Sequence, residues 1–146
     1  MILHAGLVAL HAGAGSRWRG VLIEGPSGAG KSDLMLRALD LGYRLVADDR
    51  VLLWTSGGRL FGRAPDTLRD LMEVNGVDVV RLTALPLAPV AMVVRCGHPE
   101  RLPEPRFVEH LGVRLPLVEL DPREASAPAK LGRALAAFDV AHKRRI

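Results

Sequence analysis

Short apolar runs alternate along this chain with turn residues and with apolar positions at helical spacing. Runs typical of strands predict strands at 2–10, 20–23, 44–47, 51–54, 59–62, 77–82, 90–95, 107–111 and 113–120. Helical spacing predicts helices over 31–41 and from Ala129 onward. Pro65, which suits the first turn of a helix, predicts another over 65–72. Residues 11–16 are expected to form a turn that joins the first two strands into a hairpin. Strands and helices interleave throughout, so we expect one α/β domain over residues 1–146, with a mixed sheet and flanking helices.

Composition agrees with a single domain that has a sizeable core. The 146 residues are 49% hydrophobic but only 4% aromatic, so the core must consist of Leu, Val and Ala side chains. The single cysteine, Cys96, excludes an internal disulfide and favours a reducing cytoplasm. The apolar N-terminus lacks a basic segment and is interrupted by His4, so we reject a signal peptide. No apolar stretch approaches the ~18 residues that a membrane helix needs.

The basic charge does not by itself indicate a nucleic-acid partner. The net charge is +4, and the basic residues are spread along the chain except for the final run 143–145. Cations at the C-terminal end of a helix oppose the helix dipole, and this explains the run without a polyanion. We therefore expect neither nucleic acid nor a membrane as a partner.

The segment between the strand 20–23 and the helix 31–41 fits G-x-x-x-x-G-K-[ST] at every fixed position. Glycines let the backbone turn sharply, so that successive N–H groups point at phosphate oxygens. Lys31 adds a mobile positive charge for the β and γ phosphates, the Ser32 hydroxyl suits Mg²⁺, and the helix N-terminus adds its dipole. The alternative is a glycine-rich turn with a chance lysine. We expect a nucleoside triphosphate such as ATP to bind through Gly25, Pro26, Ser27, Gly28, Ala29, Gly30, Lys31 and Ser32.

Two acidic residues, Asp48 and Asp49, follow the predicted strand 44–47. Ligands of open α/β sheets lie at the carboxyl ends of strands, so these carboxylates are expected near the phosphates. One aspartate could ligate or orient Mg²⁺, while the other could accept a proton from an attacking hydroxyl. The alternative is an Asp-Asp turn that only caps the strand. The residue pattern does not assign the two roles.

At these residues the sequence closely resembles the catalytic domain of HPr kinase/phosphorylase, from the loop and helix through Gly42–Val51. That bacterial enzyme phosphorylates a serine of HPr, the small phosphocarrier protein of the sugar phosphotransferase system, and reverses the reaction with inorganic phosphate. Leu3–Val8 is similar to the family's opening strand, and Leu71–Gly76 resembles its Leu-Leu-Glu-Ile-Arg-Gly signature. Residues 100–102 resemble a segment bearing a catalytic arginine, and 122–126 weakly resemble a late Pro/Arg segment.

The resemblance implies a P-loop fold of the HPr kinase catalytic type and a role for individual residues. Asp48 would take the proton from the substrate serine, and Ser32 and Glu73 would ligate Mg²⁺. The other catalytic residues that it implies are His4, Lys31 and Arg101. It also implies HPr or a related phosphocarrier as the protein substrate, ATP and Mg²⁺ as cofactors, and a homo-oligomer, a hexamer in the family.

The chain departs from the family in ways that bear on the reverse reaction. It begins where the family's N-terminal domain would have ended, so we expect the short form, with the catalytic domain alone. Asn75 replaces the signature arginine, and the residues after it differ from the family's Gly-x-Gly-Ile. Phosphorylase activity is therefore less expected than kinase activity. A nucleotide-binding regulatory module without catalysis and a small-molecule kinase remain as alternatives.

Overall fold

The structure is a computed structural model that describes residues 1–12 and 17–144. Its strands are β1 (Ile2–Leu3), β2 (Ala5–Ala12), β3 (Arg17–Glu24), β4 (Arg44–Ala47), β5 (Val51–Ser56), β6 (Arg59–Arg63), β7 (Leu71–Val74), β8 (Asp78–Arg81), β9 (Ala88–Cys96), β10 (Arg106–His110) and β11 (Val113–Leu120). The helices are α1 (Lys31–Leu39) and α2 (Ala127–Arg144), with a short 3₁₀ turn, η1 (Asp66–Leu68), between β6 and β7. No helix among these residues is long and apolar enough to span a membrane.

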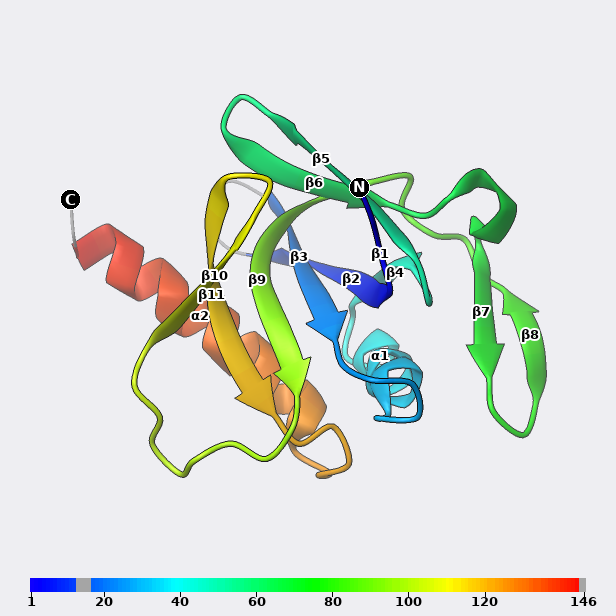
Figure 1. Cartoon of the computed structure of the whole chain (residues 1–146). Helices are drawn as coiled ribbons and strands as arrows, with labels where there is room; N and C mark the ends of the chain where they lie inside the picture. The colour runs from blue at the N-terminus through cyan, green and yellow to red at the C-terminus, as the bar shows by residue number, and fades with distance from the viewer. Residues whose placement is uncertain (13–16, 145–146) are drawn as a thin grey trace.

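The main sheet is mixed, as the sequence predicts. Its strand order is β1-β5-β6-β9-β3-β2-β4, and β11 joins β9 and carries β10 on its other side. The strands β3, β9 and β11 run parallel, so their carboxyl ends meet at one edge (Figure 1). The strand β2 is antiparallel to both β3 and β4, which confirms the predicted hairpin of the first two strands.

The two faces of the sheet are covered by different elements. Both helices pack on one face, and the curled β5–β6 hairpin covers the other (Figure 1). Successive residues of β3 therefore enter different cores: Val21 and Ile23 face the helices, and Leu22 faces the β5–β6 side. A strand covered on both faces needs a continuous apolar run, and 21–23 is such a run. The central position of β3 gives the loop that follows it a rigid base.

The predicted helix over 65–72 is wrong. Only η1 has helical turns there, and Leu71–Val74 forms β7, which pairs with β8 in a separate two-stranded sheet. The chain leaves η1 through Asp70, whose φ of 64° is incompatible with a continuing helix. The Asp70 carboxylate accepts the Ala84 N–H at 2.9 Å, so this corner is fixed from the far end of the hairpin.

The first predicted strand is interrupted at His4. β1 pairs with β5, whereas β2 pairs with β3, so the chain changes neighbours between them. In the predicted turn, 11–12 continue β2, and 13–16 lie outside the described residues. The other predicted strands and the helices at 31 and near 129 are present, with shifted ends.

Candidate functional site

The glycine-rich loop connects the buried strand β3 to α1, as its sequence context predicts. Gly28 and Gly30 have φ of 79° and 103°, a region that glycine enters without the penalty of a Cβ atom. Gly30 is the residue before the first helical turn, and Ala29 N–H donates to the carbonyl of Pro26 at 3.1 Å. The loop is therefore a tight turn that ends directly on the N-terminus of α1.

Lys31 is the first residue of α1 and is only 9% exposed. Its Nζ atom turns back over the loop and donates to the carbonyl oxygens of Gly25 and Pro26, the second at 3.0 Å. In the described part of the chain no carboxylate pairs with this buried ammonium group, and the two carbonyl oxygens serve as its acceptors. These contacts hold a positive charge over the mouth of the loop.

Asp48 is 6% exposed, and both of its carboxylate oxygens have partners. Ser32 Oγ donates to Oδ1 at 2.9 Å, and the backbone N–H of Glu73 donates to Oδ2 at 3.0 Å. The carboxylate thereby connects the start of α1 to β7. Its position is fixed from two sides, beside the serine hydroxyl.

Asp49 points away from its neighbour and toward the N-terminal strand. Its φ of 70° lies in the left-handed region, and its Oδ1 lies 2.7 Å from His4 Nε2. The side chains of Asp49 and His4 are 58% and 50% exposed, in contrast to Asp48. Its Oδ2 lies 3.9 Å from Arg50 Nε, so the second oxygen has only a loose partner. The pair is open to an incoming molecule.

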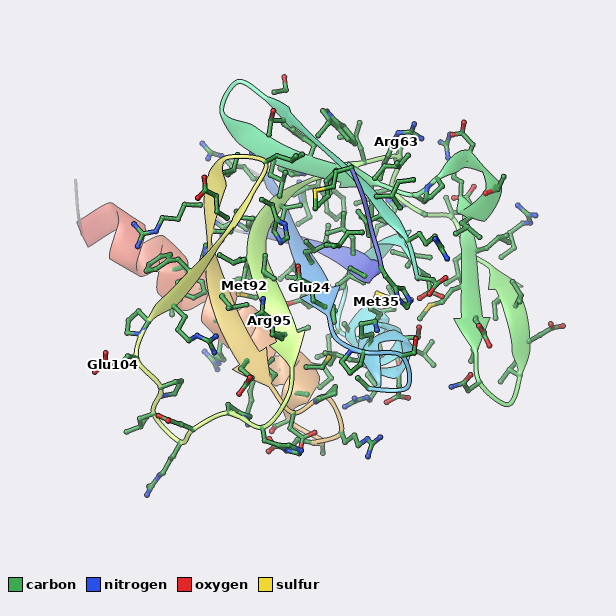
Figure 2. The ribbon with its side chains drawn as sticks, viewed as in Figure 1. Glu24, Met35, Arg63, Met92, Arg95 and Glu104 are labelled. Carbon is green, nitrogen blue, oxygen red and sulfur yellow. The ribbon has the colours of Figure 1, made fainter. Side chains whose placement is uncertain are left out.

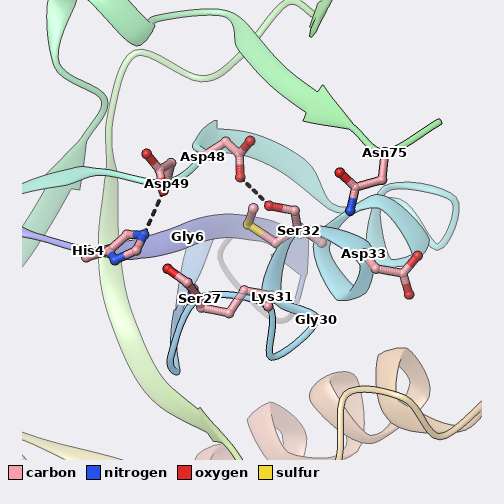
Figure 3. A pocket seen from close by; sticks show the side chains of 12 residues that line it. His4, Gly6, Ser27, Gly30, Lys31, Ser32, Asp33, Asp48, Asp49 and Asn75 are labelled. Atoms are coloured by element: carbon pink, nitrogen blue, oxygen red, sulfur yellow. Dashed lines mark hydrogen bonds and ion pairs between the residues drawn. The ribbon is translucent and has the colours of Figure 1, made fainter. Parts of the chain in front are cut away.

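These groups line one pocket of about 210 Å³, shown in Figure 3. The predicted site residues in it are His4, Ser27, Gly28, Gly30, Lys31, Ser32 and Asp48. Asp49, the second of the two predicted aspartates, also lines it, as does Asn75. Gly6, Asp33 and Met35 line it without having been predicted for the site. Asn75 follows β7, and only the fold of the β7–β8 hairpin brings it to the pocket. The residues that line the pocket thus come from segments spread between positions 4 and 75 of the chain.

Five predicted site residues do not line this pocket: Gly25, Pro26 and Ala29 of the loop itself, and Glu73 and Arg101. The Glu73 side chain is exposed, and only its N–H contacts Asp48. Arg101 is exposed in the loop 97–105, which Figure 1 shows at the end of β9, on the other side of β3 from β4. No group of three or more His, Cys, Asp or Glu side chains in the described part of the chain is arranged to hold a metal ion.

An ionic cluster that the sequence did not reveal lies at the entrance to the loop. Glu24, the last residue of β3, accepts from Arg95 Nη2 at 3.4 Å, and its Oε1 lies 2.9 Å from His110 Nε2. Glu24 and Arg95 are opposite each other in the register of β3 and β9, as Figure 2 shows. His110 arrives from β10, far along the chain. The cluster fixes the strand end immediately before Gly25.

Comparisons with known proteins identify the fold and the family. A family model described as HPr Serine kinase C-terminal domain matches residues 4–85. HPr kinase/phosphorylase of Peptoclostridium acidaminophilum is 34% identical over 125 residues, 80% of this chain and 41% of that protein. The protein of the same name from Halalkalibacterium halodurans is 31% identical over 125 residues, 80% of this chain and 40% of that protein.

A solved structure of the Hpr(Ser) kinase/phosphatase from Coxiella burnetii has the same fold. The TM-score is 0.81 at 20% sequence identity, and the match covers 98% of this chain and 99% of that chain. The chain spans about two fifths of the length of the two curated relatives. Because the family model covers more than half of this chain and includes the whole pocket, the chain belongs to the HPr serine kinase C-terminal domain family.

Proposed function

We propose that this domain transfers the γ-phosphoryl group of ATP, with Mg²⁺, to a serine hydroxyl of an HPr-type phosphocarrier protein. One observation carries the proposal: Lys31, the Ser32–Asp48 pair and the His4–Asp49 pair line a single pocket. A cation for the phosphates, a hydroxyl with a carboxylate for a metal, and an accessible acid–base pair are the parts that phosphoryl transfer requires. The names of the curated relatives support HPr as the acceptor.

Ser32 and Asp48 fit a magnesium ion. Mg²⁺ prefers oxygen ligands and is usually held by one or two carboxylates, with waters and substrate phosphates completing its shell. A hydroxyl and a carboxylate 2.9 Å apart at the N-terminus of a helix match that donor set. The backbone N–H of Glu73 contacts Asp48 at 3.0 Å, and we propose its exposed carboxylate as a third oxygen ligand. When bound, the ion would neutralise charge on the phosphates.

We assign the proton acceptor to Asp49, with His4 as its partner, rather than to Asp48. Both oxygens of Asp48 already accept hydrogen bonds, and its side chain is almost inaccessible. Asp49 is exposed and faces the pocket, so a substrate hydroxyl can reach it. His4 Nε2 lies 2.7 Å from Asp49 and can orient the carboxylate and share the proton that it accepts.

The residues then have separate tasks in the transfer. Asp49 takes the proton from the serine hydroxyl while the serine oxygen forms a bond to the γ phosphorus. The bond between that phosphorus and the bridging oxygen breaks, and ADP leaves with the electron pair. Lys31 and the N–H groups of the loop stabilise the negative charge on the phosphate oxygens.

The test is phosphorylation of HPr-type carriers with labelled ATP and Mg²⁺, followed by detection of phosphoserine. The variants Asp48→Asn and Asp49→Asn form a matched pair, because each removes one charge from adjacent positions. Asp49→Asn should lower turnover by about 10²–10⁴-fold and leave the Mg–ATP affinity unchanged. Asp48→Asn and Glu73→Gln should raise the Mg²⁺ concentration required for half-maximal phosphorylation. Binding of Mg–ATP without transfer to any carrier would contradict the kinase proposal and favour the regulatory module.

The reverse reaction and the assembly are further proposals. Asn75 lines the pocket at the position where the resemblance places an arginine, and it lacks the charge that would bind inorganic phosphate. We expect slow phosphorolysis of the phosphorylated carrier, and a gain in that rate for Asn75→Arg. Arg101 remains a proposed catalytic residue outside the pocket, and Arg101→Ala tests it in the same assay. Light scattering tests the proposed homo-oligomer.

A further inference from the structure

A second pocket of about 230 Å³ lies against the other flank of the glycine-rich loop. Its lining consists of Ala29 of the loop, Cys96 at the end of β9 with residues 97–98 after it, and residues 121–123 after β11. None of these positions, apart from Ala29 in the loop itself, belongs to the proposed phosphoryl-transfer site. The walls of this pocket therefore come from strands that the proposed function leaves without a role.

The walls of this pocket are in direct contact with the phosphate-binding loop. Arg123 Nη2 donates to the carbonyl of Gly28 at 3.4 Å. A Cβ atom placed on Gly30 would lie 3.4 Å from Pro122, and one on Gly25 would lie 2.9 Å from Cys96 Cβ. The second pocket is thus continuous with the loop, and the loop backbone separates it from the two aspartates.

The sheet topology places the two pockets so that each can hold a different part of one ligand. The carboxyl ends of β3, β9 and β11 meet at one edge, where ligands of open α/β sheets bind (Figure 1). The aspartates come from the end of β4, and the strand order β9-β3-β2-β4 puts them on the opposite side of β3 from β9. A triphosphate with its γ end near the aspartates would extend its other end toward β9 and β11.

We infer that this second pocket holds the nucleoside, the ribose and base, of the triphosphate donor. The inference rests on the proposed function and adds the recognition of the donor to it. Asp121 supplies the specific contact, because its side chain is 23% exposed and lines the pocket. Its Oδ1 accepts the Arg123 N–H at 3.0 Å, while the one partner of its Oδ2 among the described residues is His98 Nδ1 at 3.7 Å. That second oxygen can accept from the hydroxyls of a ribose.

The first experiment separates the nucleoside from the phosphates by using two ligands. ATP and inorganic tripolyphosphate are titrated, each with Mg²⁺, into the wild-type protein, Asp121→Asn and Glu124→Gln. The Asn oxygen can still accept the Arg123 N–H, so the loop is retained. Glu124 is the control, since it lies in the same loop, pairs with Lys130 at 2.6 Å and does not line the pocket. Asp121→Asn should weaken the binding of ATP about tenfold and leave the binding of tripolyphosphate unchanged, because a charged hydrogen-bond acceptor for the ribose hydroxyls is lost.

A second measurement uses the chain's only cysteine as a native probe and needs no variant. Cys96 lines the pocket and is half-buried; burial raises the pKa of its thiol, and the nearby charge of Lys31 partly offsets this effect. Either ligand places phosphate on Lys31, which removes the effect of the Lys31 charge on the thiol and slows its alkylation. The readout is therefore the difference in alkylation rate between the ATP-bound and the tripolyphosphate-bound protein. ATP should protect Cys96 from iodoacetamide more strongly than saturating tripolyphosphate does.

The outcomes distinguish this inference from the function on which it rests. Weaker ATP binding in Asp121→Asn with unchanged tripolyphosphate, together with protection specific to ATP, supports the nucleoside pocket. Equal protection of Cys96 by the two ligands, or equal effects of Asp121→Asn on both, would overturn it while leaving the phosphate site intact. Failure of both ligands to bind the wild-type protein would instead refute the proposed function.

Discussion

The one tyrosine of the chain offers a quantitative test of the packing beneath the site. Tyr43 is 5% exposed and lies in the core between the sheet and the helices. Its hydroxyl is the only buried side-chain polar atom in the described residues without a hydrogen-bond partner. Removing that oxygen in Tyr43→Phe eliminates an uncompensated polar group and keeps the ring.

The expected gain follows from the cost of burying a hydroxyl without a partner, about 1–3 kcal/mol. The small void left by the oxygen offsets part of this gain, so Tyr43→Phe should raise the free energy of unfolding by about 1 kcal/mol. For a domain of this size, that corresponds to an increase in Tm of about 2–4 °C near neutral pH.

Alkaline pH adds an independent signature of the same burial. Desolvation raises the pKa of Tyr43 from 10.0 to about 12. Below pH 10 the group is neutral in both states; as the pH rises toward 12, the unfolded state loses its proton and the folded state does not. The wild type should therefore lose about 2 kcal/mol relative to Tyr43→Phe over this interval.

Urea denaturation at pH 7 and at several alkaline values measures the stability difference, and tyrosinate absorbance measures the pKa directly because the chain has one tyrosine. Two results would refute the reasoning: a destabilised Tyr43→Phe at pH 7, or titration of the folded tyrosine near pH 10. Either one would mean that the hydroxyl has a partner in solution.

Three further substitutions test the fold and the site. Gly132→Ala should stabilise the protein by about 1 kcal/mol in thermal unfolding, because alanine favours a helix interior and its Cβ would only reach ordinary contact, 3.7 Å from the tyrosine hydroxyl. Gly20→Ala should lower the free energy of unfolding by about 1–3 kcal/mol in urea, since its Cβ would lie 2.5 Å from the backbone oxygen of Pro89 in the neighbouring strand. Ser32→Ala should weaken Mg²⁺ binding in the presence of ATP by about tenfold, because it removes a proposed metal ligand beside Asp48. A metal titration measures this change. An unchanged metal titration would remove Ser32 from the metal site.

The parts of the site that the sequence predicts are those encoded within one continuous segment. The loop, the helix that follows it and the two aspartates all lie within 25–49, and local turn and strand rules suffice to place them. In the structure, residues of this segment line one pocket. Asn75 carries no local signal for the pocket, because it arrives through the pairing of β7 with β8. The Glu24–His110 contact joins residues 86 positions apart and is equally invisible in the sequence.

The wrong helix at 65–72 shows where local rules fail. Proline at the first turn indicates a helix there. The same segment contains the alternating run Leu71–Val74, which buries Met72 and leaves Glu73 exposed once β8 is beside it. The helical and the strand pattern have similar local strength here, and pairing with β8 decides in favour of the strand. A search for periodicity within 65–72 does not include β8.

The two aspartates illustrate how a backbone angle separates functions that the sequence leaves equivalent. Adjacent residues of an extended strand place their side chains on opposite sides, but both would then face the sheet surfaces rather than the pocket. The φ of 70° at Asp49 turns the chain, so that one carboxylate meets Ser32 at the helix and the next meets His4 on the other side of the pocket. Aspartate and asparagine tolerate this left-handed conformation better than most residues, whereas alanine does not. Asp49→Asn therefore tests the chemistry of the carboxylate, while Asp49→Ala would also strain the turn that positions Asp48.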